Sequence, residues 1–420
     1  MSTTSQKAAS RWTDAAMTRR VKRRYLSERI FRGFGFAAIS LSIMFLAFLL
    51  WNMGSKGLGG FTHYEASLPI DFAKTDLFFD PATLKGPYAR STVAAVDLGG
   101  AISKAAQQAY GKDGALMFSD AAANQLTDAI IANPDIVSGT PTLWLPVSSK
   151  VDVAAKGRGD AVGERLVDLL GAKHALRRTF NLQFLTGADA TDPSAVGVWG
   201  ALKGTFYTIL VTILLAFPIG VLAAVYLEEF ASRNRWTDAI EVSINNLAAV
   251  PSIIFGLLGL AVFLDIMNLP RSAPLVGGLT LALMTFPVIV IAGRNAIKTV
   301  PPSIRDAALG VGASKMQVTF HHVLPLALPG ILTGTIIGVA RALGETAPLL
   351  MIGMRAFVAT PPGSIADPST VLPVQIFLWS DEVDRGFIEK TSAAIIVLLL
   401  FMLLMNGIAI YLRNRFERRW

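Results

Sequence analysis

Six long stretches without a charged side chain limit what this chain can fold into. They cover residues 33–55, 204–227, 242–264, 272–293, 316–340 and 391–412, and each has 22 to 25 residues. A helix of about 20 apolar residues spans the hydrocarbon core of a bilayer. The sequence therefore predicts an all-α polytopic membrane protein with six transmembrane helices. We place the fifth helix at about residues 326–350, beyond His321 and His322.

The composition agrees with this class. Hydrophobic residues make up 52% of the 420-residue chain, and charged residues only 16%, against about 25% in soluble domains. These values argue against a disordered chain and against an ordinary cytosolic enzyme. The absence of cysteine excludes disulfide scaffolds, thiolate metal sites and a cysteine nucleophile.

The basic residues predict the orientation in the membrane. The leader 1–32 holds nine Lys and Arg, and the predicted inner segments together hold 19 in 76 residues. The short predicted outer segments hold four in 44. Because cytoplasmic flanks carry the basic excess, both the leader and the tail 413–420 are predicted to be cytoplasmic. The net charge of +8 is then explained by cytoplasmic flanks that contact membrane lipid, and no nucleic-acid partner is expected.

The polar segment 56–203 separates the first span from the other five and is long enough for a small domain. Ser119 and Asp120 suit the start of a helix that ends near Asn133, and Asp160 suits the start of another that ends near Gly171. We expect a folded α+β extracytoplasmic insert here, and its role is not evident from the sequence.

Residues 301–330 predict a helical hairpin on the cytoplasmic face. Pro301 and Pro302 suit the start of a helix, and Gly312 suits a turn. A second helical run leads to Leu324 and Pro325. Such a hairpin can dock into a groove on a partner, or it can be an ordinary connector between two spans.

The same stretch resembles the EAA loop of ABC-importer permeases. The positions that match are Asp306, Ala307, Ala308, Gly312, Leu324 and Pro325. Asp306 replaces the usual Glu, and His322 stands where Ile is usual. The resemblance implies that a coupling loop, about residues 294–325, fits a cleft on an ATPase subunit and transmits its motion.

Further segments, such as GVLAAVYLEEFA at 220–231 and ARALGETAPLL at 340–350, resemble the PstA family, the permease subunits of phosphate-specific ABC importers. The resemblance covers about residues 196–412. It implies an ABC type I importer permease core at 204–412, in the inner membrane of a bacterium. It also implies a second, PstC-like permease subunit, a PstB-like ATPase dimer and a periplasmic, PstS-like phosphate-binding protein.

Arg341 and Glu345 are the candidate residues for substrate translocation. They are one helical turn apart, and Arg341 is 13 residues past Leu328, which is about 20 Å along a helix. Ionisable groups at such depth mark substrate paths by default, and a guanidinium fork suits the oxygens of phosphate. A buried structural ion pair is the alternative.

Other residues of the spans have structural interpretations. Glu228 and Glu229 are expected to form a solvated charged cap, or to contact the ATPase or the first cytoplasmic helix. Four residues are expected to kink a helix or to permit close packing, rather than to form a gate: Pro218, Pro251, Gly256 and Pro287.

The chain contains no G-x-x-x-x-G-K-[ST] motif. We therefore expect a non-catalytic permease that binds no cofactor, with ATP–Mg held by the partner ATPase. No metal site is expected, because the adjacent His321 and His322 have no further candidate ligands nearby.

Two other function classes remain open at this stage. The chain can be a permease for another oxyanion, such as phosphonate, sulfate or molybdate. It can also be a membrane-anchored extracytoplasmic sensor that works through partners. An intramembrane enzyme is disfavoured, because the spans hold no paired carboxylates, Ser–His pair or metal motif.

Overall fold

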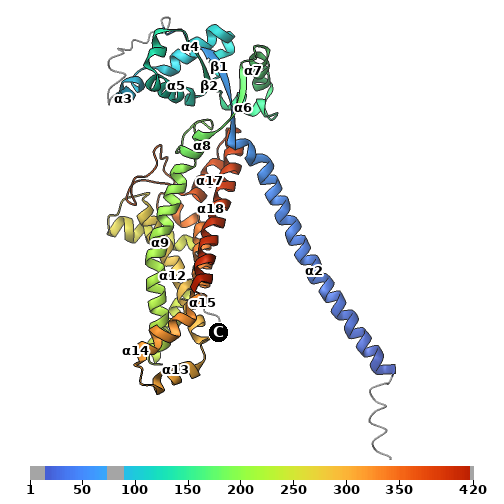
Figure 1. Cartoon of the computed structure of the whole chain (residues 1–420), viewed down its shortest axis with the longest axis vertical. Helices are drawn as coiled ribbons and strands as arrows, with labels where there is room; N and C mark the ends of the chain where they lie inside the picture. Colours follow the sequence, from blue (N-terminus) through green and yellow to red (C-terminus); the bar gives the residue numbers. More distant parts are fainter. Residues whose placement is uncertain (1–14, 73–88, 417–420) are drawn as a thin grey trace, which may run out of the picture. The chain divides into compact units, whose positions relative to one another are not determined.

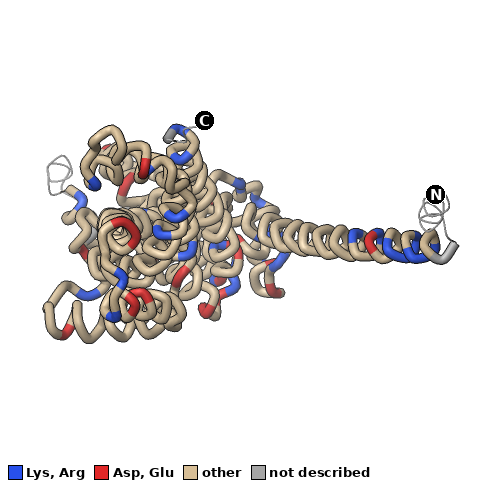
Figure 2. The backbone as a smooth tube through the Cα atoms, turned by 90° about the horizontal axis from the view of Figure 1, so that it is seen from below, with Lys and Arg blue, Asp and Glu red and all other residues tan. Residues whose placement is uncertain are grey.

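The computed structural model describes residues 15–72 and 89–416, and the chain divides into two compact units, residues 1–55 and 56–420. The predicted leader and tail lie partly outside the described residues. Helix α2 (Ala15–Gly57) runs without a break from the leader through the first predicted span. Its Lys and Arg residues gather toward its N-terminal end (Figure 2), and an apolar stretch follows them.

In the second unit, the insert is an α+β domain, as predicted. Strand β1 (Thr62–Pro69) lies between β2 (Thr142–Pro146) and β3 (Leu176–Phe180) and pairs antiparallel with both. The remaining elements of the insert are η2 (Leu58–Phe61), α3 (Ala89–Ala94), α4 (Leu98–Tyr110), η5 (Lys112–Leu116), α5 (Asp120–Ala132), η6 (Pro134–Ser138), α6 (Ser149–Ala155), α7 (Ala161–Ala172) and α8 (Leu182–Thr186).

Two cores hold the insert together, and both reach one face of β1. Leu68 is fully buried among apolar residues of α4 and α5, and Ala66 is fully buried against α6 and α7. Asp160 begins α7 as predicted, and its carboxylate accepts a hydrogen bond from the Gly163 amide at 2.7 Å. Helix α5 begins after Ser119, as predicted, although that hydroxyl donates to the Pro146 carbonyl instead of capping the helix.

The rest of the second unit is a helix bundle. Its elements are α9 (Trp199–Val225), η7 (Tyr226–Phe230), α10 (Arg235–Ala248), α11 (Ser252–Gly259), η8 (Leu260–Ile266), α12 (Pro274–Lys298), α13 (Pro302–Gly310), α14 (Lys315–Gln317), η9 (Val318–Val323), α15 (Leu324–Leu343), α16 (Ala347–Met351), α17 (Leu372–Ser380) and α18 (Gly386–Phe416). The short helices α13 and α14 lie at one end of the bundle, and the insert lies at the other (Figure 1).

Small residues set the spacing of the central helices α9 and α12. A methyl group added at Gly278 would lie 2.5 Å from the Val211 side chain, and one added at Gly220 would lie 2.7 Å from Ile289. Glycines at such contacts let two helices approach closely, which is how helices gain packing energy within a membrane.

One predicted span is wrong as a single helix. Residues 242–264 divide among α10, α11 and η8, and the chain bends by 102° beside Pro251, between α10 and the segment formed by α11 and η8. The pair is either a broken span or a re-entrant loop. Within the described residues, five helices are long and apolar enough to cross a membrane, and the bent pair brings the number to six if it counts as one span.

Candidate translocation and coupling sites

The hairpin predicted at residues 301–330 is present. Helix α13 begins at Pro302, and the chain turns at Gly312, whose φ of +91° favours glycine because a side chain is strained there. Ser314 and Gln317 then form a capping box that starts α14. The second arm continues through the π-helical turn η9 into α15, with Leu324 and Pro325 at the start of that helix.

The EAA-type residues divide between the surface and the core. Ala308 is 8% exposed and packs in the apolar cluster that holds the hairpin to the bundle. Asp306 and Ala307 are exposed, and so is His322. Leu309 and Val311 expose apolar surface beside them. The hairpin therefore exposes the Asp306 carboxylate beside apolar groups, which suits a protein partner.

Arg341 lies in the last turn of α15, but Glu345 does not lie on the same helix. Helix α15 ends at Leu343, so the predicted span 326–350 ends too late. Glu345 follows Gly344 in the turn before α16. The Nε atom of Arg341 is 3.5 Å from a carboxylate oxygen of Glu345, and the two side chains are 51% and 20% exposed.

Contacts with neighbouring helices show how deep Arg341 lies. Its neighbour Ala342 lines the same small cavity as Leu281 of α12 and Thr208 of α9. At 1.5 Å per residue, Leu281 lies about 10 Å from the first residue of α12, and Thr208 about 13 Å from that of α9. Both helices begin at the end of the bundle that carries the insert (Figure 1). Arg341 therefore lies about one-third of the way along these helices from the end that carries the insert.

Three of the four kink or packing candidates lie at helix contacts or breaks. Pro287 is buried inside α12, whereas Pro218 is exposed within α9, which is unbroken there. Pro251 caps α11 at the sharp bend. A methyl group added at Gly256 would lie 2.7 Å from the backbone of Pro348, so α11 packs directly on α16.

The interpretation of Glu228 and Glu229 as a solvated cap is wrong. Both lie in η7, a single π-helical turn at the end of α9. Glu229 forms an ion pair with Arg305 of α13, at 2.6 Å. Glu228 is 3.4 Å from Arg294 of α12 and 3.7 Å from Lys298. Because these partners are distant in sequence, local patterns gave no sign of the pairing.

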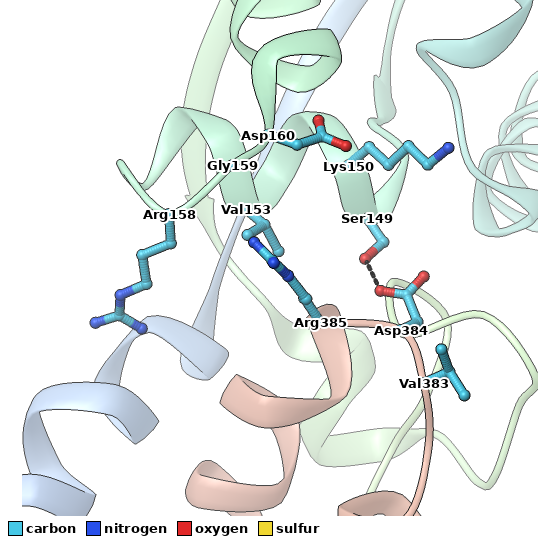
Figure 3. Close-up of a pocket in the computed structure, with 9 residues that line it drawn as sticks. All are labelled: Ser149, Lys150, Val153, Arg158, Gly159, Asp160, Val383, Asp384 and Arg385. Carbon is cyan, nitrogen blue, oxygen red and sulfur yellow. Dashed lines mark hydrogen bonds between the residues drawn. The ribbon is translucent and has the colours of Figure 1, made fainter.

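A third feature lies where the insert meets the start of α18. A cavity of about 310 Å³ opens there, and the Ser149 hydroxyl donates to Asp384 at 2.7 Å across it (Figure 3). Charged residues of both signs line it: Lys150, Arg158, Arg385, Asp160 and Asp384. This mixed lining favours neither an anion nor a cation. An ion cluster beside the cavity joins the buried Lys156 and the half-exposed Arg158 to the buried Glu389.

Comparisons with known proteins assign the two parts of the chain to different families. Residues 216–420 match the family described as binding-protein-dependent transport system inner membrane component. Residues 18–164 match a family described as a domain of unknown function, DUF3333. The transport match begins within α9 and takes in the hairpin and Arg341.

Two bacterial proteins and one solved structure resemble this chain. The probable ABC transporter permease protein YqgI of Bacillus subtilis is 31% identical over 209 residues, which cover 47% of this chain and 70% of the relative. The phosphate transport system permease protein PstA of Haemophilus influenzae is 31% identical over 211 residues, covering 50% and 73%. The inward-facing MetNI methionine ABC transporter aligns with 53% of this chain and 98% of its own, at 18% identity and a TM-score of 0.42.

Proposed function

The chain belongs to the family of binding-protein-dependent transport system inner membrane components, and from this premise we propose that it is the PstA-type permease of an ATP-driven phosphate importer. The family places it among ABC importer permeases, which are non-catalytic and work with a separate ATPase and a periplasmic binding protein. The substrate and the individual partners are our proposal.

The position of Arg341 supports an anionic substrate. Its guanidinium is half exposed on the surface of this chain. At its depth in the predicted span an ionisable side chain is costly, and such residues mark substrate paths. Phosphate must shed water to cross a membrane, and a planar guanidinium offers several donors to its oxygens. The likeness of the permease core to a phosphate permease supports phosphate over other oxyanions.

The remaining parts follow from this assignment. The hairpin of α13 and α14 would face the cytoplasm and bind a PstB-like ATPase dimer. The insert, at the opposite end of the bundle (Figure 1), would face the periplasm, where a PstS-like protein delivers phosphate. A PstC-like subunit would supply the other half of the pathway. Transport would proceed by alternating access, driven by closure of the ATPase dimer.

Uptake of radiolabelled phosphate at low micromolar concentration tests the proposal. Deleting the gene for this chain, in cells without another phosphate system, is expected to abolish uptake. Excess sulfate or molybdate is expected to leave uptake through the intact importer unchanged. Inhibition by either competitor would favour the other-oxyanion alternative, and uptake that persists after deletion would remove the phosphate assignment.

The Arg341→Ala variant tests the residue that carries the argument. It is expected to stop uptake while the complex with the ATPase still assembles, because Arg341 is far along α15 from the hairpin. Arg355→Ala is the matched control, since Arg355 is exposed and lies outside the helices. Normal uptake by Arg341→Ala would contradict a role for this side chain in translocation.

A further inference from the structure

The π-helical turn η7 contacts both arms of the hairpin. Three successive residues of this turn contact three different elements. Glu228 is 3.4 Å from Arg294 of α12, and Glu229 pairs with Arg305 of α13. Lys315 of α14 lies over the ring of Phe230, 5.3 Å from its centroid. Single π-helical turns are uncommon and are frequently found at functional sites.

The pair of Glu229 and Arg305 is the tightest of these contacts. Arg305 donates to one carboxylate oxygen from Nη2 at 2.6 Å and from Nε at 3.1 Å. The Glu229 side chain is 9% exposed and that of Arg305 is 22% exposed. A charge-assisted bond in such a shielded place is much stronger than an ion pair in open solvent.

Arg305 also contacts the end of α12. Its Nη1 donates to the Val300 carbonyl at 2.7 Å, and its Nη2 to the Ile297 carbonyl at 3.1 Å. One guanidinium on α13 is therefore bonded both to the end of α9 and to the end of α12. A planar guanidinium with this many partners has little freedom to rotate, so a displacement of α13 acts on both membrane helices.

The network continues to α10. Arg294 donates from Nη2 to Glu241 of α10 at 2.9 Å. Thus η7 contacts α12, α13 and α14 directly, and Arg294 of α12 connects it to α10. In contrast, Asp306 and Ala307 on the outer face of α13 are exposed, so the partner-facing and bundle-facing sides of the hairpin are chemically distinct.

We propose that η7 transmits displacement of the hairpin to α9 and α12, and that Glu229 and Arg305 are the positioning residues for this step. The inference rests on the proposed function, in which the hairpin binds the ATPase. Without the ion pair, the hairpin still follows the ATPase, but less of its movement reaches the helices that open and close the pathway. ATP hydrolysis then continues while transport falls.

The test uses the whole importer in proteoliposomes, with its ATPase, second permease and phosphate-binding protein. ATP hydrolysis and phosphate uptake are measured in the same vesicles. Glu229→Gln, which keeps the shape and removes the charge, is expected to lower uptake per ATP about tenfold. The matched control is Asp238→Asn, an exposed carboxylate on α10, which is expected to leave that ratio unchanged.

A double variant, studied with and without a cross-link, separates transmission from folding. The natural chain has no cysteine, so Glu229→Cys with Arg305→Cys introduces its only thiols, in a complex with cysteine-free partners. Before treatment this variant is expected to hydrolyse ATP with little transport, and joining the thiols with a short bismaleimide is expected to restore uptake per ATP. A residue needed only for folding would not regain function after cross-linking.

The outcomes distinguish this inference from the proposed function. Glu229→Gln with the wild-type uptake per ATP would overturn the inference, and so would a cross-linked variant that stays uncoupled. If Glu229→Gln fails to assemble, the cross-linked variant decides between transmission and folding. A wild-type complex that transports sulfate or molybdate but not phosphate would contradict the proposed substrate, and the same ratio would then be measured with that anion.

Discussion

Replacing Lys156 with Met is expected to loosen the insert from the helix bundle. The Lys156 ammonium is bonded to two carboxylates, Asp152 at 2.6 Å and Glu389 at 2.9 Å. It also donates to the carbonyls of Thr62 at 2.9 Å and Gly59 at 3.0 Å. Its side chain is only 8% exposed. Methionine has a similar length, so the substitution removes the charge and the donors while filling most of the same space.

The expected cost follows from what the substitution leaves behind. Removing one partner of a buried ion pair costs about 3–5 kcal/mol, because the other charge stays buried. Here Glu389 keeps a bond from Arg158 at 3.0 Å, and Asp152 keeps one from the Tyr64 amide at 2.8 Å. The lower end of the range therefore applies, and about 3 kcal/mol corresponds to about a hundredfold change in the opening equilibrium.

Hydrogen exchange in the full-length chain measures this opening directly. Amides in Leu58–Pro69, the segment that holds both carbonyl acceptors, are expected to exchange about a hundredfold faster in Lys156→Met, since exchange follows the free energy of local opening. Lys150→Met is the control, on helix α6, which Lys156 follows directly. Lys150 is exposed, and its replacement is expected to change exchange by less than about threefold.

A double variant checks the physical cause. If the penalty arises from an uncompensated carboxylate, adding Glu389→Gln to Lys156→Met should recover part of the lost protection, because a neutral amide is less costly to bury. Exchange in Lys156→Met that matches the Lys150→Met control would refute the reasoning, since the ion cluster would then contribute nothing to attachment of the insert.

Two further predictions concern other parts of the chain. Burial alone raises the pKa of Glu65, but hydrogen bonds from His63 and Arg177 outweigh burial and hold this pKa below the usual 4.5. The insert should therefore lose stability as the pH falls below 4.5, and thermal unfolding of Glu65→Gln should depend less on pH in that range. Gly312→Ala places a side chain in a turn with a φ of +91°, and this strain costs about 1 kcal/mol. Titration of the permease with the ATPase should therefore show about fivefold weaker binding. The control variant Gly310→Ala, outside this strained region, should bind the ATPase normally.

The transmembrane helices were predictable because lipid leaves the backbone few alternatives. A charge-free run of this length within a bilayer must satisfy its own hydrogen bonds, and a helix does so within one segment. Their ends were less predictable. Helix α12 continues to Lys298, five residues past the apolar run, and α18 begins at Gly386, five residues before its run. Backbone hydrogen bonding does not stop where the apolar residues stop.

The break at Pro251 shows where counting charges is insufficient. The run 242–264 has the length of a span, but its first part belongs to α10, which begins well before it at a capping box of Asn234 and Thr237. Proline removes a backbone donor and disfavours helix in the residue before it. The capping box and Pro251 together indicated two helices, and the long apolar run concealed them.

Side-chain pairing across the bundle was beyond the reach of local patterns. Glu229 and Arg305 are 76 residues apart in sequence, and Glu389 lies 233 residues from Lys156. The insert shows the same limit. The capping residue Asp160 predicted the start of α7, whereas the Ser119 hydroxyl bonds to the distant Pro146 carbonyl instead of capping α5. The order β2-β1-β3 depends instead on contacts between distant segments.

The end of α15 changes how Arg341 and Glu345 relate to each other. On an intact helix, two residues four apart stay neighbours whatever binds nearby. Here the helix ends at Leu343, and Glu345 lies beyond Gly344 in a turn. The pair is also long, at 3.5 Å, with Arg341 half exposed. Rotation about a few backbone bonds of that turn can therefore separate the carboxylate from the guanidinium without unwinding a helix. A permanent structural pair would be expected to be shorter and more buried, so this geometry favours a guanidinium that can exchange its carboxylate for an anion in transit.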